Sequence, residues 1–143
     1  SSAVRAAGWA EALVLATPAD GWVRAPNGAR ARAAIAGEVV HVEVECGAVL
    51  DEVVLRSYCT GAAHMALGWV RSEGIVVGAD GVPLDLTIRS FGVLRAADTP
   101  AIDVRVVQSA AAPLNGSDAV FAAVAAAAWR HDGFPARWPT MRA

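Results

Sequence analysis

The sequence predicts an α+β fold in which a mostly antiparallel sheet carries two long helices on one face. Residues 37–46 and 101–110 alternate apolar and polar side chains, which is typical of half-buried strands. Residues 51–73 have the length and the terminal residues of a long helix, and residues 117–132 have those of a second.

The N-terminal third is predicted to end in the clearest strand of the chain. Residues 4–16 are apolar and fit either a helix or a strand, whereas residues 17–31 are rich in Pro, Gly and Asn and indicate a loop. Residues 37–46 then form a strand with His41 on its solvated face. The buried face is expected to carry Val40, Val42, Val44 and Cys46.

The predicted helix 51–73 has acids at its start and a thin middle. Asp51 and Glu52 suit the positive end of the helix dipole. Small residues then allow another backbone or a ligand to come close, although tight helix packing is the commoner reason for them. These small residues are Gly61, Ala62, Ala63, Ala66 and Gly68.

The rest of the chain is predicted to hold a hairpin, a strand, a helix and an irregular tail. Asp80-Gly81 marks the hairpin turn within residues 75–86. Ile102, Val104 and Val106 share one face of the strand 101–110. Residues 134–143 show no regular pattern.

The last predicted helix combines a polar start with an apolar body. Ser117 is expected to cap it, with Asp118 in its first turn and Gly133 after its end. Residues 119–129 are apolar all round, and such a helix is buried all round. Because a small two-layer domain rarely buries a helix in this way, we expect a second polypeptide to cover its outer face.

Composition points to one domain that contacts another chain. Of the 143 residues 55% are apolar and 18% charged, against about 25% charged in an average globular domain. The net charge of −2 and the mixed signs predict no nucleic-acid partner, and the apolar runs are shorter than the roughly 20 residues of a membrane span. Two cysteines, Cys46 and Cys59, and no visible signal peptide fit reduced thiols and a cytoplasmic location.

Three segments in order, residues 44–74, 86–107 and 113–129, carry short motifs with a shared spacing. The motifs are Glu45-Cys46-Gly47, Leu50-Asp51, Gly61-Ala62, Ala66-Leu67-Gly68, Asp98-Thr99-Pro100 and Gly116-Ser117-Asp118. This series resembles the C-terminal part of the molybdenum-binding subunit of the xanthine dehydrogenase/aldehyde oxidase family, over roughly residues 36 to 130.

The resemblance implies hydroxylation of an aldehyde or an N-heterocycle by a molybdenum-bound hydroxide. It implies a molybdopterin held mostly by a larger partner chain, with iron–sulfur clusters and FAD on further subunits and no metal ligand in this chain. The family's molybdenum subunit is several times longer than these 143 residues, so this chain would complete a site that another chain mainly builds.

The resemblance also assigns site residues. A family glutamate that acts as base aligns with Asp118, and a glutamine near the molybdenum aligns with Tyr58, so these two are the candidate catalytic residues. Candidate cofactor-binding residues are Gly61, Asn115, Gly116 and Ser117. Asp118 is one methylene shorter than glutamate, and the helix start favours its charged form, which makes it a weaker base. Residues 117 and 118 also fit a plain helix cap, and Tyr58 fits a packing role.

Three functions therefore remain open from the sequence. The first is a small subunit or C-terminal portion of a molybdenum-cofactor hydroxylase. The second is a non-catalytic assembly subunit of such a complex, which the replaced glutamate and glutamine favour. The third is a stand-alone small-molecule-binding domain with its pocket beside the thin helix.

Overall fold

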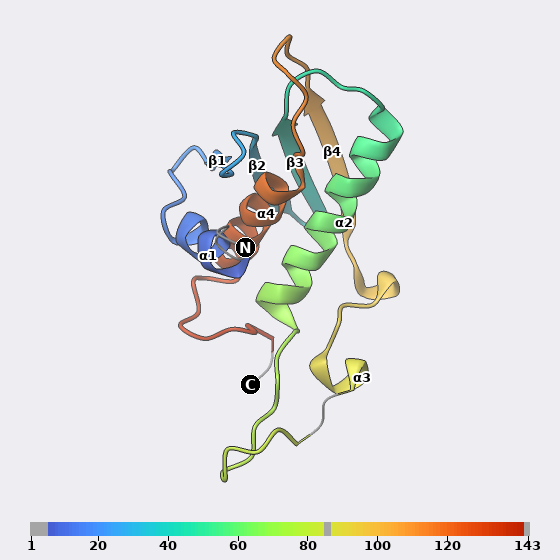
Figure 1. The fold of residues 1–143 in the computed structure, drawn as a ribbon. Coiled ribbons are helices and arrows are strands. Elements are labelled where there is room, and N and C mark those ends of the chain that lie inside the picture. The colour runs from blue at the N-terminus through green and yellow to red at the C-terminus, as the bar shows by residue number, and fades with distance from the viewer. Residues whose placement is uncertain (1–5, 85–86, 142–143) are drawn as a thin grey trace.

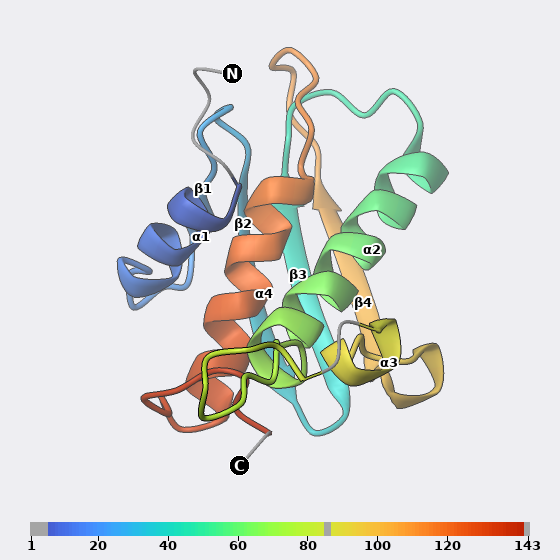
Figure 2. The same ribbon diagram turned by 60° about the horizontal axis from the view of Figure 1, so that its bottom comes forward.

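The computed structural model describes residues 6–84 and 87–141 and confirms an α+β fold (Figure 1). Parts of the predicted segments 4–16, 75–86 and 134–143 lie outside the described residues, namely residues 4, 5, 85, 86, 142 and 143. The elements in order are α1 (Ala6–Leu15), β1 (Val23–Arg24), β2 (Arg30–Ala36), β3 (Val39–Glu45), α2 (Glu52–Arg71), α3 (Ile88–Phe91), the 3-10 helix η1 (Ala96–Asp98), β4 (Ala101–Val107) and α4 (Ser117–His131). The long helices α2 and α4 lie on the same face of the sheet, as expected (Figure 2).

The sheet has four strands in the order β1-β2-β3-β4. The pairs β1–β2 and β2–β3 are antiparallel, whereas β3 and β4 are parallel because α2 crosses over between them. The prediction of a mostly antiparallel sheet is therefore confirmed for two of the three strand pairs, and the third pair is parallel. As a consequence β3 and β4 both end at the same edge of the sheet, where the chain turns into α2 and α4 (Figure 2).

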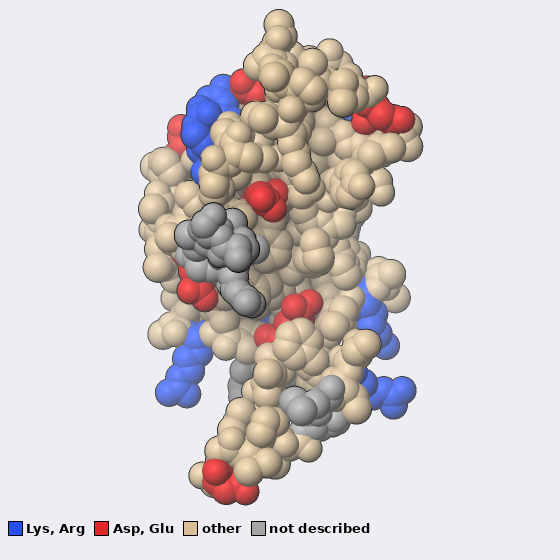
Figure 3. Space-filling model, in the orientation of Figure 1, with Lys and Arg blue, Asp and Glu red and all other residues tan. Residues whose placement is uncertain are grey.

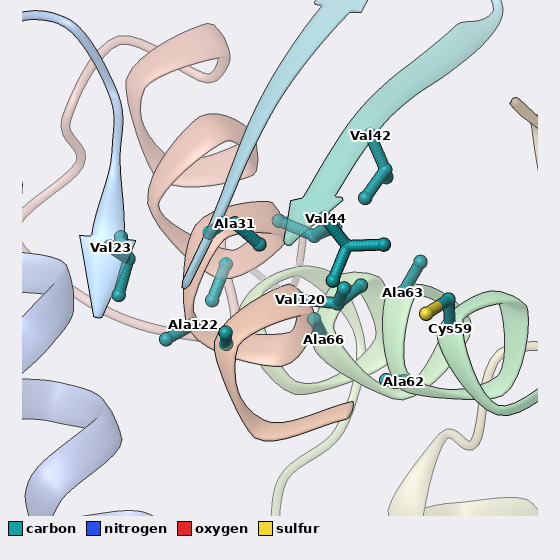
Figure 4. Packing of buried hydrophobic residues seen from close by; sticks show 14 of the residues in the cluster. Val23, Ala31, Val42, Val44, Cys59, Ala62, Ala63, Ala66, Val120 and Ala122 are labelled. Carbon is teal, nitrogen blue, oxygen red and sulfur yellow. The ribbon is translucent and has the colours of Figure 1, made fainter. Parts of the chain in front are cut away.

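The core between the sheet and the helices is built from small apolar residues (Figure 4). Val40, Val42 and Val44 on β3 are at most 1% exposed, which confirms the predicted buried face. On α2 the small residues Ala63 and Ala66 are fully buried, so most of the thin stretch serves helix packing. Short side chains let α2 lie close to the alanine-rich α4, and these two helices make the most extensive helix–helix contact of the fold.

Helix α4 is buried by this chain alone, so the expectation that a second polypeptide must cover it is wrong. Its buried residues are Ala119, Val120, Ala122, Ala123, Val124, Ala125, Ala126, Ala127 and Ala128. Helix α1 lies along one flank, α2 along the other, and β2 and β3 lie beneath (Figure 2). Because alanine is short, these neighbours approach closely enough to enclose the helix without an outside partner.

Aromatic rings close the far end of the helical layer. Trp138 of the C-terminal segment meets Trp69 of α2 edge-on at 4.8 Å between ring centroids, and it also contacts Trp129 of α4 at 6.2 Å. Thr140 N–H donates to the main-chain oxygen of Val70 at 2.8 Å. The irregular tail is thereby fixed to the ends of both long helices.

Residues 72–84 and 87–100 extend away from the sheet (Figure 1). The predicted turn around Asp80 is confirmed by a bridge between Val77 and Pro83 and by a 2.8 Å bond from Gly78 N–H to Val82 O. Several large apolar side chains of this segment are exposed, among them Ile75, Leu84 and Ile88. No helix within the described residues is both long and apolar enough to cross a membrane.

Candidate functional site

Two loops meet at the edge where β3 and β4 end, and they hold each other in place. Ala48 N–H donates to Ala111 O at 2.9 Å, and Leu114 N–H donates to Cys46 O at 2.8 Å. Between these bonds Gly47 has a φ of +80°, and a Cβ added there would overlap the main-chain oxygen of Ala112. In sheets with parallel strands, ligands commonly bind beyond the carboxyl ends of those strands. This edge is therefore the first place to look for a site.

A groove of about 360 Å³ lies at this edge, between the two loops and the first turns of α2. Tyr58 and Asn115, which the sequence analysis singled out, both line it. The remaining walls are mostly apolar, from residues such as Leu50 and Leu114. These apolar residues were not predicted to take part. The sequence feature that indicates them is a leucine in each of the two loops, Leu50 after β3 and Leu114 after β4.

Asn115 holds the start of α4 from the position before the N-cap residue Gly116. The helix begins at Ser117, and Asn115 Oδ1 accepts a hydrogen bond from Ser117 N–H at 2.9 Å. The main-chain oxygen of Asn115 also accepts a bond from the Asn27 amide at 2.8 Å. The predicted cap at Ser117 is therefore wrong, because Ser117 is already the first helical residue and the N-cap position is Gly116, which has no side chain to accept a bond.

Gly116 is required by packing inside this chain. It is buried, and an added Cβ would lie 2.8 Å from Val44 Cγ2 on β3. Any side chain here would push the start of α4 away from the sheet. This explains the glycine without a ligand, although a close approach of the backbone to a ligand remains compatible with it.

Asp118 lies in the first turn of α4, as predicted, and its side chain is exposed. This side chain does not line the groove, and it forms no hydrogen bond or ion pair with the residues that the structure describes. The structure thus places Asp118 at the same edge as Tyr58 and Asn115 but outside the groove that those two share. Its charge faces solvent at the positive end of the helix dipole.

Gly61 lies on the exposed side of α2, with open space where a Cβ would be. It lines a different hollow, of about 500 Å³, together with His64 and Ile102. The structure therefore does not bring Gly61 to the groove, although Tyr58 is one turn earlier on the same helix.

The groove offers no cationic side chain to an anionic cofactor. Arg is a common ligand of phosphate groups, and no Arg lines this groove. Its one carboxylate, Asp51, is occupied as the cap of α2, where it accepts a bond from Val54 N–H at 3.0 Å. The nearby Arg56 is held by Glu52 at 2.7 Å. Among the described residues no three His, Cys, Asp or Glu side chains cluster as metal ligands.

The two thiols near the groove are buried and free. Burial raises the pKa of Cys46. Burial, reinforced by the neighbouring Cys46, raises the pKa of Cys59 to about 11, although Arg56 acts in the opposite direction. Both side chains are therefore neutral thiols near pH 7, and neither is an activated nucleophile.

Comparison with known proteins gives a likeness of fold. No family model matches the sequence, and no curated protein matches it. Among solved structures, quinoline 2-oxidoreductase from Pseudomonas putida 86 is similar, with a TM-score of 0.54 and 16% sequence identity. The match covers 65% of this chain and 13% of that protein, so this chain corresponds to a small part of it. At this identity the likeness shows a shared fold.

Proposed function

We propose that this chain is a small subunit or C-terminal portion of a molybdenum-cofactor oxidoreductase of the hydroxylase type. Two separate likenesses support this. The motif series of residues 44–129 resembles the end of the molybdenum-binding subunit in that family. The fold is shared with an enzyme whose name states oxidation of quinoline, which is an N-heterocycle. An aldehyde or N-heterocycle substrate and a cytoplasmic location belong to the same proposal.

In this proposal the edge where β3 and β4 end faces a larger chain that holds the molybdopterin. Large apolar side chains are exposed there, with Leu50 at 84%, Val53 at 79% and Tyr58 at 63%. Contiguous exposed apolar side chains of this kind mark contact surfaces. In the view of Figure 3 much of the surface is uncharged, and the Arg side chains lie toward its rim. Iron–sulfur clusters and FAD would then be on further subunits.

The site residues would act from this edge. Asp118 would present a carboxylate to the site of the larger chain, and Gly116 and Ser117 would lie beside it at the start of α4. Asn115 would hold that start in place through its bond to Ser117 N–H. Tyr58 would line the entrance from α2, and Gly61 would allow a close approach one turn further along that helix.

A non-catalytic assembly subunit is the second candidate. It is favoured by the position of Asp118, which is exposed and lies outside the groove. It is also favoured by the lack of a cation in the groove, because the chain then contributes little of its own to an anionic cofactor.

Turnover of the intact complex separates the two candidates. The complex is purified from the native host with Asp118→Asn and, as a matched control, with Glu38→Gln, an exposed acid in the β2–β3 turn at the opposite edge of the sheet. Loss of a general base lowers the rate by roughly 100-fold or more. We expect that loss only for Asp118→Asn, with complex mass and cofactor content unchanged. Full turnover of an intact Asp118→Asn complex would instead establish the assembly role.

A further inference from the structure

Strand β4 is the outermost strand on one side of the sheet, so its outer side forms an open lateral edge. At the opposite edge β1 has two residues, whereas β4 has seven. Ala101 N–H donates to Glu38 O at 3.1 Å, so the main-chain groups of Ala101 point toward β3. The oxygen of Val104 instead accepts a bond from Arg56 and points away from β3. Because main-chain groups alternate in direction along a strand, Ile102, Val104 and Val106 direct their N–H and C=O groups outward.

The side chains of β4 are self-complementary about Val104. If a second β4 lies antiparallel with Val104 opposite Val104, then Asp103 of each copy lies opposite Arg105 of the other. On the helix-covered face, Ile102 of each copy lies opposite Val106 of the other. Opposite-charge and apolar cross-strand pairs both stabilise a sheet. Each pair occurs twice, as expected for an interface in which both copies use the same surface.

We propose that β4 pairs with β4 of a second copy of this chain about a two-fold axis at Val104. Two four-stranded sheets then join into one continuous sheet. The outward N–H and C=O groups of Ile102, Val104 and Val106 form the ladder between the copies. This dimer goes beyond the function proposed above and does not rest on it.

The surroundings of β4 leave room for the second copy. Asp103 and Arg105 are 69% and 73% exposed, and their contacts inside the chain are long, at 3.4 Å to His41 and 3.2 Å to Glu43. Both side chains can therefore turn toward a partner at little cost. The hollow beside Gly61 and Ile102 lies next to the same edge and gives space to a neighbouring helix.

Arg56 covers part of this edge in the isolated chain. Its guanidinium bonds to the outward oxygen of Val104 and must move aside when the strands pair. It keeps its partner Glu52, one turn earlier on α2, so the movement does not leave a charge unpaired. A charged side chain over an open strand is a common protection of sheet edges. Arg56 thus shields the edge of a free monomer and is displaced in the dimer.

A charge-swap experiment tests the dimer. The wild-type chain is expected to be a dimer by sedimentation and native mass spectrometry. Asp103→Arg places two pairs of arginines face to face, and Arg105→Asp places two pairs of acids face to face. Each variant alone should raise the dissociation constant by roughly tenfold or more. An equimolar mixture restores both opposite-charge pairs, so the heterodimer should form. Arg89→Asp on α3 is the control and should leave the dimer unchanged.

Hydrogen exchange of the wild-type chain gives a second readout that needs no variant. The amides of Ile102, Val104 and Val106 should be protected at concentrations where the dimer forms and exposed on dilution. A wild-type monomer, a dimer that both variants leave intact, a mixture that fails to pair, or unprotected amides would each overturn the proposal. So would variants that break only a complex with a different chain, since the edge would then bind a strand of that chain.

Discussion

Asn115 Oδ1 accepts a hydrogen bond from Ser117 N–H at 2.9 Å and so fixes the first turn of α4 against the loop that follows β4. The N-cap residue Gly116 has no side chain that could accept a hydrogen bond from the first turn. The side chain of Asn115 supplies an acceptor in its place. The start of the helix that carries Asp118 therefore depends on a residue outside the helix.

Replacing Asn115 by Ala should destabilise the chain by about 1 kcal/mol, because Ser117 N–H at the start of α4 loses its acceptor. Ser117→Ala is the matched variant and should change stability by less than about 0.5 kcal/mol. Chemical denaturation of both variants measures the difference. Equal losses, or a larger loss for Ser117→Ala, would restore Ser117 as the cap.

Gly47 and Gly61 should respond in opposite ways to replacement by alanine. Gly47→Ala should destabilise by about 2 kcal/mol or more, because its φ is +80° and the new Cβ meets the Ala112 oxygen. Gly61→Ala should stabilise the isolated chain by roughly 0.5–1 kcal/mol, because it lies inside α2 next to open space. Thermal unfolding of the two variants checks both signs.

If Gly61 also lies against a cofactor or a partner, as proposed, Gly61→Ala should weaken the complex while it stabilises the free chain. A variant that stabilises the chain and leaves the complex unchanged would remove Gly61 from the site.

The sequence predicts elements well where periodicity and caps agree. Helix α2 begins after Asp51 as expected, and that carboxylate does accept from Val54 N–H. The buried face of β3 follows directly from alternation. Strand β2 was not predicted, because its segment Arg30–Ala36 is rich in Ala and Arg and lacks the β-branched run that marks a strand.

The burial of α4 shows what local patterns do not reveal. An apolar helix predicts complete burial, and this is correct, but the pattern does not say which elements provide it. Here α1 closes one flank, and residues 4–16 fitted a helix or a strand equally well from sequence. The sequence does not predict the groove for a similar reason. Tyr58 and Asn115 line it together only because the loops after β3 and β4 come together in the fold.

Asp132 should stabilise the chain in a pH-dependent way. Burial acts to raise its pKa, but hydrogen bonds from Arg71, Thr140 and His131 and the charge of Arg71 bring it below the ordinary carboxyl value. Because the folded pKa is the lower one, the stabilisation is present above pH 4, near the value for an unfolded chain, and disappears as the pH falls through the folded pKa.

Asp132→Asn should therefore lower the free energy of unfolding by about 1–3 kcal/mol near neutral pH, because the bidentate contact with Arg71 at 2.9 and 3.1 Å is lost. The gap between wild type and variant should shrink toward zero in acid. A gap that stays constant from neutral to acidic pH would show that the carboxylate charge is not involved.

Both thiols should resist alkylation in the folded chain. Cys59 is fully buried and its pKa is raised to about 11, so the reactive thiolate is scarce at pH 7. Iodoacetamide should label Cys46 and Cys59 only under denaturing conditions, as read by intact mass. Rapid labelling of the native chain would show that the loops around the groove open on the timescale of the reaction.

The composition of the native assembly tests the central claim most directly. The chain is purified from its own host under mild conditions and examined by native mass spectrometry together with molybdenum and pterin analysis. The account predicts a defined complex with a longer polypeptide that contains stoichiometric molybdenum and pterin. A chain that is recovered without any longer partner, or a complete complex that contains neither molybdenum nor pterin, would contradict it.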